Sequence, residues 1–338
     1  MTILHELPDD PVRVWEEFYE RGWSDGLPIV PPTPERVAAM LDGVEADAGE
    51  VVAKLSPSLN AVTVEKIAVN AVMAGCLPGS VPVLAAAVRG IAQPTFRLLT
   101  IGTPPATPLI MLNGPIRHAL DVNCSYCALG GVTRANATLG RALRLICLNI
   151  ANGGARAILD QATHGLPTRV GACLGENEEL SPWEPFHVER GFGAEESTVT
   201  VVNIVSPIDI LEQEARSAAS LARTFGGSMT VQGTTNMLNS FGTPFLILGL
   251  EHAALLAREG LSKDAVRRLL WDEAWLPLDR FPPEVREKFE HTKRPVVDGR
   301  VYLTPEPENL QIAVAGGYGP RSVYFSVIGN YQIEPIER

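Results

Sequence analysis

Two segments of the chain, about 135 residues apart, share one order of local patterns, and this internal resemblance constrains the fold most strongly. The first copy consists of residues 100–103, a short loop and residues 107–114, and the second of residues 231–234, a longer loop and residues 243–249. Each copy predicts a strand that ends in Gly-Thr, followed by a buried strand that begins with Thr-Pro and ends at glycine. Duplication is one interpretation, and a chance match of short apolar strands is the other.

Helical patterns flank both copies. Alanine-rich segments precede them at 81–92 and 210–224, and further helical segments follow at 135–151 and 262–271. Short, continuous apolar strands between helices are typical of a sheet that is buried on both faces. We therefore predict an α/β fold of two structurally related half-units, with mainly buried β-strands covered by helices.

The remaining segments complete the predicted organisation. Residues 1–60 form an N-terminal helical and proline-rich segment, 61–160 the first α/β half-unit, and 206–338 the second. Residues 161–205 are a connecting polar segment and strand. The connector begins polar and broken by prolines, and it ends in the β-branched run 197–205, which predicts the strand.

Composition excludes several classes of function. A chain of 338 residues, 46% hydrophobic and 20% charged, can bury a sizeable core. Its formal net charge of -11 repels nucleic-acid phosphates, so no nucleic-acid partner is expected. The longest apolar runs are far shorter than the roughly 20 residues of a membrane-spanning helix, and the N-terminus lacks the pattern of a secretion signal. We expect a cytoplasmic protein with no membrane partner.

The five cysteines are an odd number in a long chain, which favours reduced thiols in a cytosol. Cys124 and Cys127 have the Cys-x-x-Cys spacing of a redox pair or of half a zinc site. A single nucleophilic or ligand-binding thiol and inert packing are the other interpretations. No nucleotide-binding or zinc-hydrolase motif occurs. We therefore expect no evident cofactor, with zinc or another thiol-bound metal as the alternative and no metal ligand assigned.

The loop after the first Thr-Pro strand is the first candidate site. Asn113, Asn123 and Cys124 lie there, at the end of a strand where α/β folds place their ligands. Arg134 and Asn136 open the next predicted helix, whose positive end and free N–H groups can bind an anion. We predict that these side chains position a polar or anionic substrate, with solvated charge as the alternative for Arg134.

The connector offers the second candidate site, because aromatic side chains alternate there with titratable ones. Trp183 precedes Glu184, and His187 follows within the same proline-rich loop. Aromatic residues in such a loop pack inward and draw their neighbours with them, and an apolar setting shifts a pKa toward neutrality. Glu184 and His187 are predicted to supply acid–base function and Trp183 to contact substrate. A surface loop with solvated acids is the alternative.

With these residues in view, the sequence resembles a conserved, functionally uncharacterised bacterial family encoded beside small proteins with a selenocysteine- or cysteine-Gly-Ser-Cys (UGSC-type) motif. The matching stretches are 22–28, 31–33, 63–76, 113–115, 134–142, 162–165 and 181–192. Cys76 and Cys124 match family positions, whereas Cys127 departs from the pattern and puts a shared Cys-x-x-Cys function in doubt. His164, in one matching stretch, joins the substrate-binding candidates. The resemblance implies a partner with a reactive thiol or selenol, and no particular reaction.

The predicted function is a thiol-assisted small-molecule enzyme of hydrolase or lyase type, with Cys124 or Cys76 as nucleophile. It would act on a polar or anionic metabolite, alone, as a homo-oligomer, or as the large subunit of a two-component enzyme with a UGSC-type partner. An oxidoreductase or metal-dependent enzyme that uses Cys124 and Cys127 is one alternative. A non-catalytic binding subunit is the other.

Overall fold

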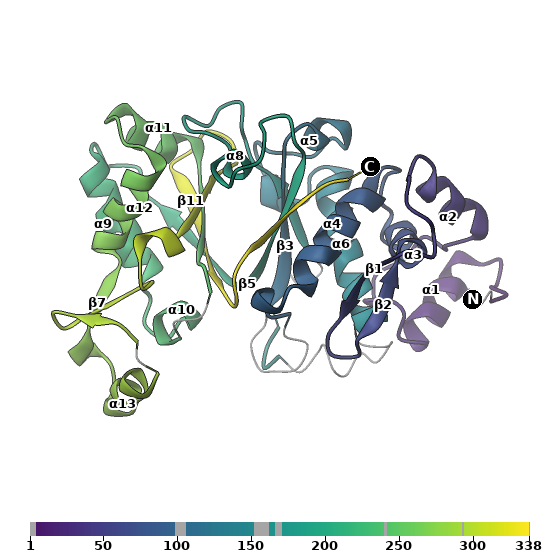
Figure 1. Ribbon diagram of the computed structural model, residues 1–338, viewed down its shortest axis with the longest axis horizontal. Coiled ribbons are helices and arrows are strands. Elements are labelled where there is room, and N and C mark those ends of the chain that lie inside the picture. Colours follow the sequence, from purple (N-terminus) through teal and green to yellow (C-terminus); the bar gives the residue numbers. More distant parts are fainter. Residues whose placement is uncertain are drawn as a thin grey trace.

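The computed structural model describes residues 5–98, 106–151, 162–165, 171–239, 242–292 and 294–337, which form a mixed α/β structure (Figure 1). The helices are α1 Pro11–Glu20, α2 Pro34–Leu41, α3 Val64–Ala74, α4 Ser80–Ala92, α5 Ile116–Ala119, α6 Arg134–Ile146, α8 Phe186–Glu189, α9 Ala218–Met229, α10 Thr235–Leu238, α11 Leu250–Arg258, α12 Lys263–Glu273 and α13 Pro283–His291. The strands are β1 Val51–Leu55, β2 Asn60–Thr63, β3 Thr107–Asn113, β4 Ala172–Gly175, β5 Thr198–Leu211, β6 Phe245–Leu248, β7 Trp275–Pro277, β8 Val296–Val297, β9 Arg300–Tyr302, β10 Gln311–Val314, β11 Arg321–Val327 and β12 Gln332–Pro335. Among the described helices, none combines the length and the apolar character needed to span a bilayer.

Side-chain caps explain where several helices begin. A hydroxyl directly before α2, α3, α6, α9 and α12 accepts a backbone N–H from the first turn, which satisfies a donor that the helix itself leaves free. These caps are Thr33, Thr63, Thr133, Ser217 and Ser262. Helix α3 ends at Gly75, whose φ of 84° lies in the left-handed region that glycine adopts most readily.

The main sheet has the strand order β10-β6-β11-β5-β3-β4, and β12 pairs with β5 outside this path. The two edge pairs, β3 with β4 and β6 with β10, are parallel, and the other pairs are antiparallel. Residues 198–204 of β5 pair with β3, whereas residues 204–211 pair with β11. The long strand β5 therefore carries the curled sheet from one half of the molecule to the other.

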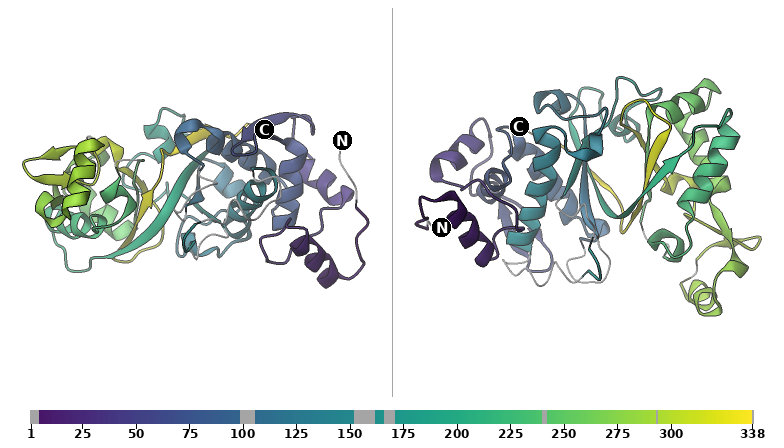
Figure 2. Two further views of the ribbon diagram at one scale, coloured as in Figure 1. Left: turned by 90° about the horizontal axis from the view of Figure 1, so that it is seen from below. Right: turned by 180° about the vertical axis from the view of Figure 1, so that it is seen from behind.

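Three groups of buried side chains divide the interior. Ile110 and Val201 belong to the group under α3, α4 and α6, and Leu246 to the group under α9, α11 and α12. Leu109 and Phe245 belong to the third group, because successive residues of a strand point to opposite faces. Helices thus cover the outer face of both halves (Figure 2), and the inner face packs on itself and on α8.

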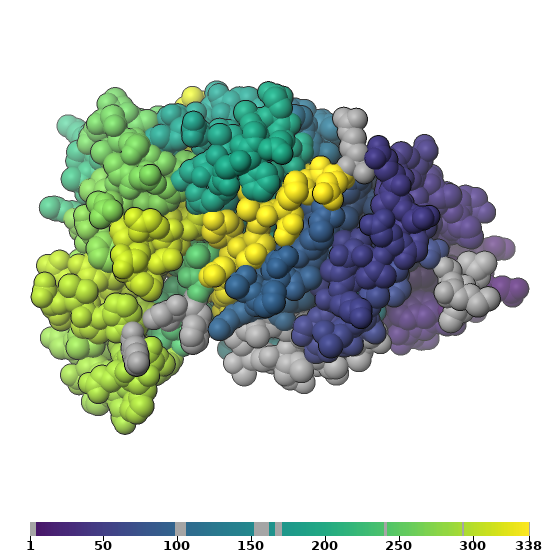
Figure 3. Space-filling model, in the orientation of Figure 1, coloured from purple at the N-terminus to yellow at the C-terminus, as the bar shows by residue number. Residues whose placement is uncertain are grey.

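Both ends of the chain are fastened to the first half. Strand β12 runs beside α4 as a yellow band in Figure 3, and Arg89 Nη2 of α4 donates to the carbonyl oxygen of Pro335 at 3.0 Å. Near the N-terminus, Arg141 Nε and Nη2 of α6 each donate to a carboxylate oxygen of Asp25 at 2.9 Å. This paired contact fixes the glycine- and proline-rich segment 22–28 against α6.

The predicted segments at 81–92, 135–151, 197–205 and 262–271 are confirmed as α4, α6 with one further turn of π-helix, β5 and α12. The helix predicted over 210–224 is wrong at its start, because β5 continues to Leu211 and α9 begins only after its cap Ser217. Residues 231–234 form a turn rather than a strand. Strand β4 is absent from the sequence-based prediction, and the strand predicted at residues 100–103 lies outside the described residues.

Candidate functional site

Buried polar side chains gather where β3 and β4 end. Asn113 is the last residue of β3 and Glu176 directly follows β4, and the parallel register of the two strands brings them to the same edge. Both side chains have no exposed surface, and Asn113 Nδ2 donates to Glu176 Oε2 at 2.5 Å. We use the name β3–β4 cluster for Asn113, Arg117, Cys124, Glu176, Glu178 and Glu179.

Glu176 joins three elements through its carboxylate. Besides Asn113, the backbone N–H of Phe186 donates to Oε2 at 2.6 Å and that of Val314 donates to Oε1 at 3.3 Å. Burial raises the pKa of Glu176, although the charge of Lys263 and these hydrogen bonds oppose the rise. The carboxyl group therefore holds its proton more readily than an exposed glutamate and ties α8 and β10 to the end of β4.

Arg117 is the cation of the cluster, and only 3% of its surface is exposed. It donates to the carbonyl oxygens of Gly114 and Glu176 at 3.1 and 2.8 Å. Its Nη2 lies 2.8 Å from Glu178 Oε2 and 2.9 Å from Glu179 Oε1. The hydrogen bond from Arg117 is the main reason why the pKa of Glu179 falls to about 2. This side chain therefore holds the loop after β3 against the segment after β4.

Cys124 reaches the cluster from the loop after α5. Arg117 Nη1 donates to its Sγ at 3.6 Å, and the thiol lies against Gly175, where an added Cβ would come within 2.3 Å of the sulfur. Burial raises the pKa of Cys124, and the hydrogen bond and charge of Arg117 oppose that rise. The resting group is therefore a thiol whose thiolate form has an adjacent positive charge.

Asn123 and Asn136 are committed to the shape of this loop. Asn136, 2% exposed, accepts the Asn123 N–H at 2.8 Å and donates to the carbonyl oxygens of Asn123, Ala128 and Cys173. The Asn123 carboxamide closes a turn onto the backbone of Ser125. The two amides thus place Cys124 rather than present free hydrogen-bonding groups to a substrate.

Arg134 and Cys76 form a separate contact at the end of α3. Arg134 Nε donates to the carbonyl oxygen of Gly75 at 2.7 Å and its Nη2 to that of Cys76 at 3.2 Å. Cys76 itself is 3% exposed, and burial raises its pKa to about 11. The burial of the Cys76 thiol and its high pKa both favour Cys124 over Cys76 as the reactive thiol.

The connector residues divide into two sets. His187 is fully buried and follows Phe186, whose N–H is bonded to Glu176 in the cluster. Trp183 instead donates from Nε1 to the carbonyl oxygen of Leu261 at 2.9 Å, and the exposed Glu184 contributes only its backbone oxygen, to Lys263. His164 is exposed in the described stretch 162–165. Among the hydrogen bonds of the described residues, the one that joins the segment 183–187 to the cluster is that from the N–H of Phe186, next to His187, to Glu176.

Several buried polar atoms on β3, β5 and α8 have unused hydrogen-bonding capacity. Within the described residues, Asn113 Oδ1 and both ring nitrogens of His187 have no hydrogen-bond partner. The same holds for Oγ1 of Thr198, which pairs with Asn113 across the β3–β5 ladder and so points to the same face. Buried polar atoms are paired in the great majority of cases. The interior beside the cluster is therefore suited to hydrogen-bond a polar group.

The sequence reasoning missed Arg117 and Glu176 and did not single out Glu178 or Glu179. A signal was present, because the run Glu176-Asn177-Glu178-Glu179 follows the apolar residues 172–175. If residues 172–175 are recognised as a strand parallel to β3, the carboxylates that follow them are placed beside Asn113.

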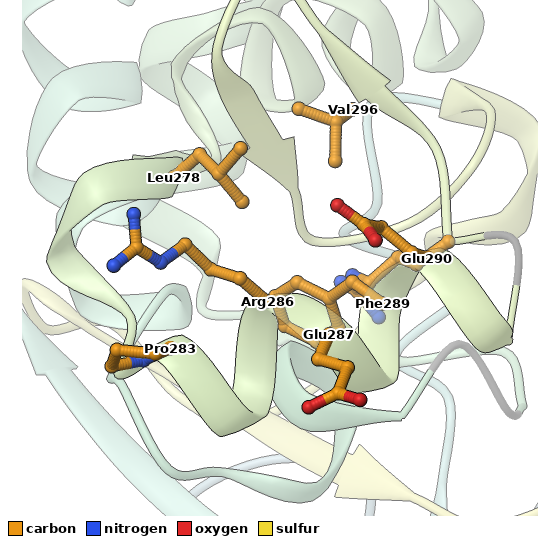
Figure 4. Close-up of a pocket in the computed structure, with 8 residues that line it drawn as sticks. Leu278, Pro283, Arg286, Glu287, Phe289, Glu290 and Val296 are labelled. Atoms are coloured by element: carbon orange, nitrogen blue, oxygen red, sulfur yellow. The ribbon is translucent and has the colours of Figure 1, made fainter.

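A hollow that lies away from the cluster is found beside α13 (Figure 4). It has a volume of about 640 Å³ and is lined by Leu278, Pro283, Arg286, Glu287, Phe289, Glu290, Arg294 and Val296. None of the predicted site residues lines it. Among the described residues, no group of three or more histidine, cysteine or acidic side chains is arranged to hold a metal ion.

Comparison with known proteins gives no further assignment: no family model matches the chain, and no curated protein or solved structure is significantly similar to it. The resemblance to the UGSC-associated family therefore stays a prediction.

Proposed function

We propose that the protein is a thiol-assisted small-molecule enzyme of hydrolase or lyase type, with Cys124 as the nucleophile. The observation that carries this proposal is the position of the buried Arg117 guanidinium against Cys124 Sγ, at 3.6 Å. A neighbouring cation favours the thiolate, which is the nucleophilic form of cysteine. Because Glu178 and Glu179 already pair with this guanidinium, we propose a polar substrate in preference to an anionic one.

Three further side chains have proposed roles. His187 is the acid–base candidate, because both ring nitrogens lack a partner within the described chain and its helix is bonded to Glu176. Asn113 Oδ1 is the candidate acceptor for a substrate N–H or O–H group. Glu176 is a positioning residue, since it holds the Asn113 amide and the start of α8.

We also propose that the two halves are related by duplication. Strands β3 and β6, from the two similar segments, each occupy the second place from an edge of the sheet and each is parallel to its edge strand. Strands β5 and β11 then occupy equivalent central places. This order supports two related half-units, but β4 and the first part of β5, which complete the first of them, lie in the segment 161–205 predicted as the connector. The same segment brings α8 to the end of β3 and β4.

The thiol is tested by alkylation with iodoacetamide over a range of pH, followed by peptide mass spectrometry. We expect Cys124 to react faster as pH rises, and Arg117→Met to move that rise to higher pH because the stabilising cation is lost. The exposed Cys127 is the internal control and should not respond to Arg117→Met. An unchanged Cys124 profile in Arg117→Met would remove the basis of the proposal, as would full turnover of an identified substrate by Cys124→Ala.

One observation favours the oxidoreductase alternative: Cys124 and Cys127 reach the surface in one loop, whereas the other three cysteines are buried. Thiol titration before and after mild oxidation, with elemental analysis, tests it. A reversible disulfide or a bound metal at these thiols would replace the hydrolase or lyase proposal. Co-purification from the native host tests the UGSC-type partner, the homo-oligomer and the non-catalytic binding subunit.

A further inference from the structure

A second hollow, of about 290 Å³, lies between the end of α8, the start of α12 and strand β10. Its lining residues are Glu189, Arg190, Asp264, Arg267, Glu308, Gln311 and Tyr331. None of them belongs to the β3–β4 cluster, so any ligand of this hollow is additional to the substrate of the thiol site.

At the inner end of the hollow, three cations surround the carboxylate of Glu189, two of them in the lining and Lys263 behind it. Lys263 and Arg267, 6% and 4% exposed, both pair with the carboxylate of Glu189, and Arg190 Nη1 lies 3.2 Å from the same group. Burial raises the pKa of Glu189, but the three cations together hold it below its usual value. These three cations share the carboxylate of Glu189, and Arg267 has a second partner in the exposed Asp264. The inner end of the hollow therefore has more buried positive than buried negative charge, which is unfavourable without a further counter-charge.

The guanidinium of Arg190 is held in place by several neighbouring side chains. Its Nε donates to the Tyr331 hydroxyl at 2.6 Å, its Nη2 donates to Gln311 Oε1, and its guanidinium carbon lies 4.5 Å from the centre of the Phe186 ring. With the contact to Glu189, three of its five N–H groups have a partner among the described residues and two have none there. A fixed guanidinium with free donors matches the geometry of a carboxylate.

The mouth of the hollow has the opposite charge. The side chains of Asp264 and Glu308 are 87% and 69% exposed there, and their partners are Arg267 and Arg268. A second anionic group on a ligand would be repelled by these acids, whereas an ammonium group would be attracted. The hollow therefore has a cationic inner wall and an acidic rim.

We propose that this hollow binds a small zwitterion of the amino-acid type, with its carboxylate on Arg190 and Arg267 and its ammonium group toward Asp264 and Glu308. The proposal goes beyond the proposed thiol chemistry and does not depend on it. A volume of about 290 Å³ suits a ligand of this size.

Titration calorimetry of the full chain with three matched probes tests the site: 4-aminobutanoate, butanoate and succinate. We expect 4-aminobutanoate to bind most tightly, butanoate more weakly and succinate most weakly. Arg190→Gln should weaken 4-aminobutanoate about tenfold or more, as expected for loss of a charge-assisted hydrogen bond. Arg223→Gln, on the exposed face of α9, is the matched control and should bind like the unchanged chain.

Glu308→Gln, at the exposed rim, keeps the test valid if Arg190→Gln fails to fold. It should reduce the preference for 4-aminobutanoate over butanoate without weakening butanoate. Cys124→Ala should bind all three probes normally, which separates this site from the thiol proposal. Absence of binding by every probe at millimolar concentration, binding of succinate as tight as that of 4-aminobutanoate, or an unchanged preference in Glu308→Gln would overturn the assignment.

Discussion

Replacement of Arg117 by methionine tests whether one buried cation holds the candidate site together. The substitution keeps most of the aliphatic volume and removes the guanidinium. Glu178, whose side chain is 11% exposed, would lose its cationic partner and keep the N–H donors of Asn113 and Gly114. Removal of one member of a buried ion pair costs about 3–5 kcal/mol. Glu179 adds little, because its side chain is 53% exposed and its pairing is screened by solvent.

The two carbonyl oxygens of Gly114 and Glu176 would also lose a side-chain donor, at about 1 kcal/mol or less each, and that of Gly114 keeps the backbone N–H of residue 117. Because these losses overlap with the ion-pair term, we expect a total decrease of about 3–5 kcal/mol in the free energy of unfolding. Urea unfolding followed by circular dichroism measures it. The slope of the transition should stay unchanged, since the change affects stability and not the extent of unfolding.

Arg134→Met is the matched control for this experiment. Arg134 also donates to two carbonyl oxygens, of Gly75 and Cys76, but it has no buried carboxylate partner among its hydrogen bonds. We expect it to lose only about 1–2 kcal/mol. Equal losses in the two variants, or a loss below about 1 kcal/mol in Arg117→Met, would show that the ion pair with Glu178 is not what stabilises the cluster.

Three further predictions concern neighbouring positions. The raised pKa of Glu176 means that the folded state binds this proton more tightly than the unfolded state does. The group therefore contributes stability at low pH that is lost as pH rises above 4.5 through the folded pKa. Glu176→Gln should flatten that part of the stability–pH curve, and an unchanged curve contradicts the assignment. Gly114→Ala should lose at least about 2 kcal/mol in urea unfolding, because Gly114 has a φ of 77° and the new Cβ would lie 2.2 Å from the Glu196 carbonyl oxygen. Gly317→Ala, measured in the same way, should lose less than about 0.5 kcal/mol, because the obstacle is the movable ring of Tyr126, 64% exposed; similar losses in the two alanine variants would refute this distinction.

Patterns that depend on neighbours in the sequence were predicted well. Helix α4 lies one residue from the predicted start, and α12 begins directly after the hydroxyl of Ser262. The error at residues 210–217 has a tertiary cause, because pairing with β11 extends β5 to Leu211 across a segment that had been assigned to a helix. Strand β4 escaped prediction because four residues are too few for a periodic pattern, and its pairing with β3 defines it.

For the candidate site, local sequence located the loop with Asn113 and Cys124 but not the groups that surround it. Arg117 meets Glu178 and Glu179 across about 60 residues of sequence, and no local signal relates them. The same is true of Glu176 and Val314, which meet only because the sheet curls. The sequence predicts Arg134 and Asn136, at the head of α6, as ligand groups, whereas the packing of α6 against α3 and β4 directs them to backbone carbonyls.

The sequence alone determined the α/β class, the places where capped helices begin and the apolar strands that form the core, since these follow from short-range sterics, hydrogen bonding and periodicity. Tertiary structure alone decided which charged groups lie together. The energy of an ion pair or a buried carboxyl depends on distance and solvent exposure, and long-range strand pairing sets both of these at Arg117 and Glu176.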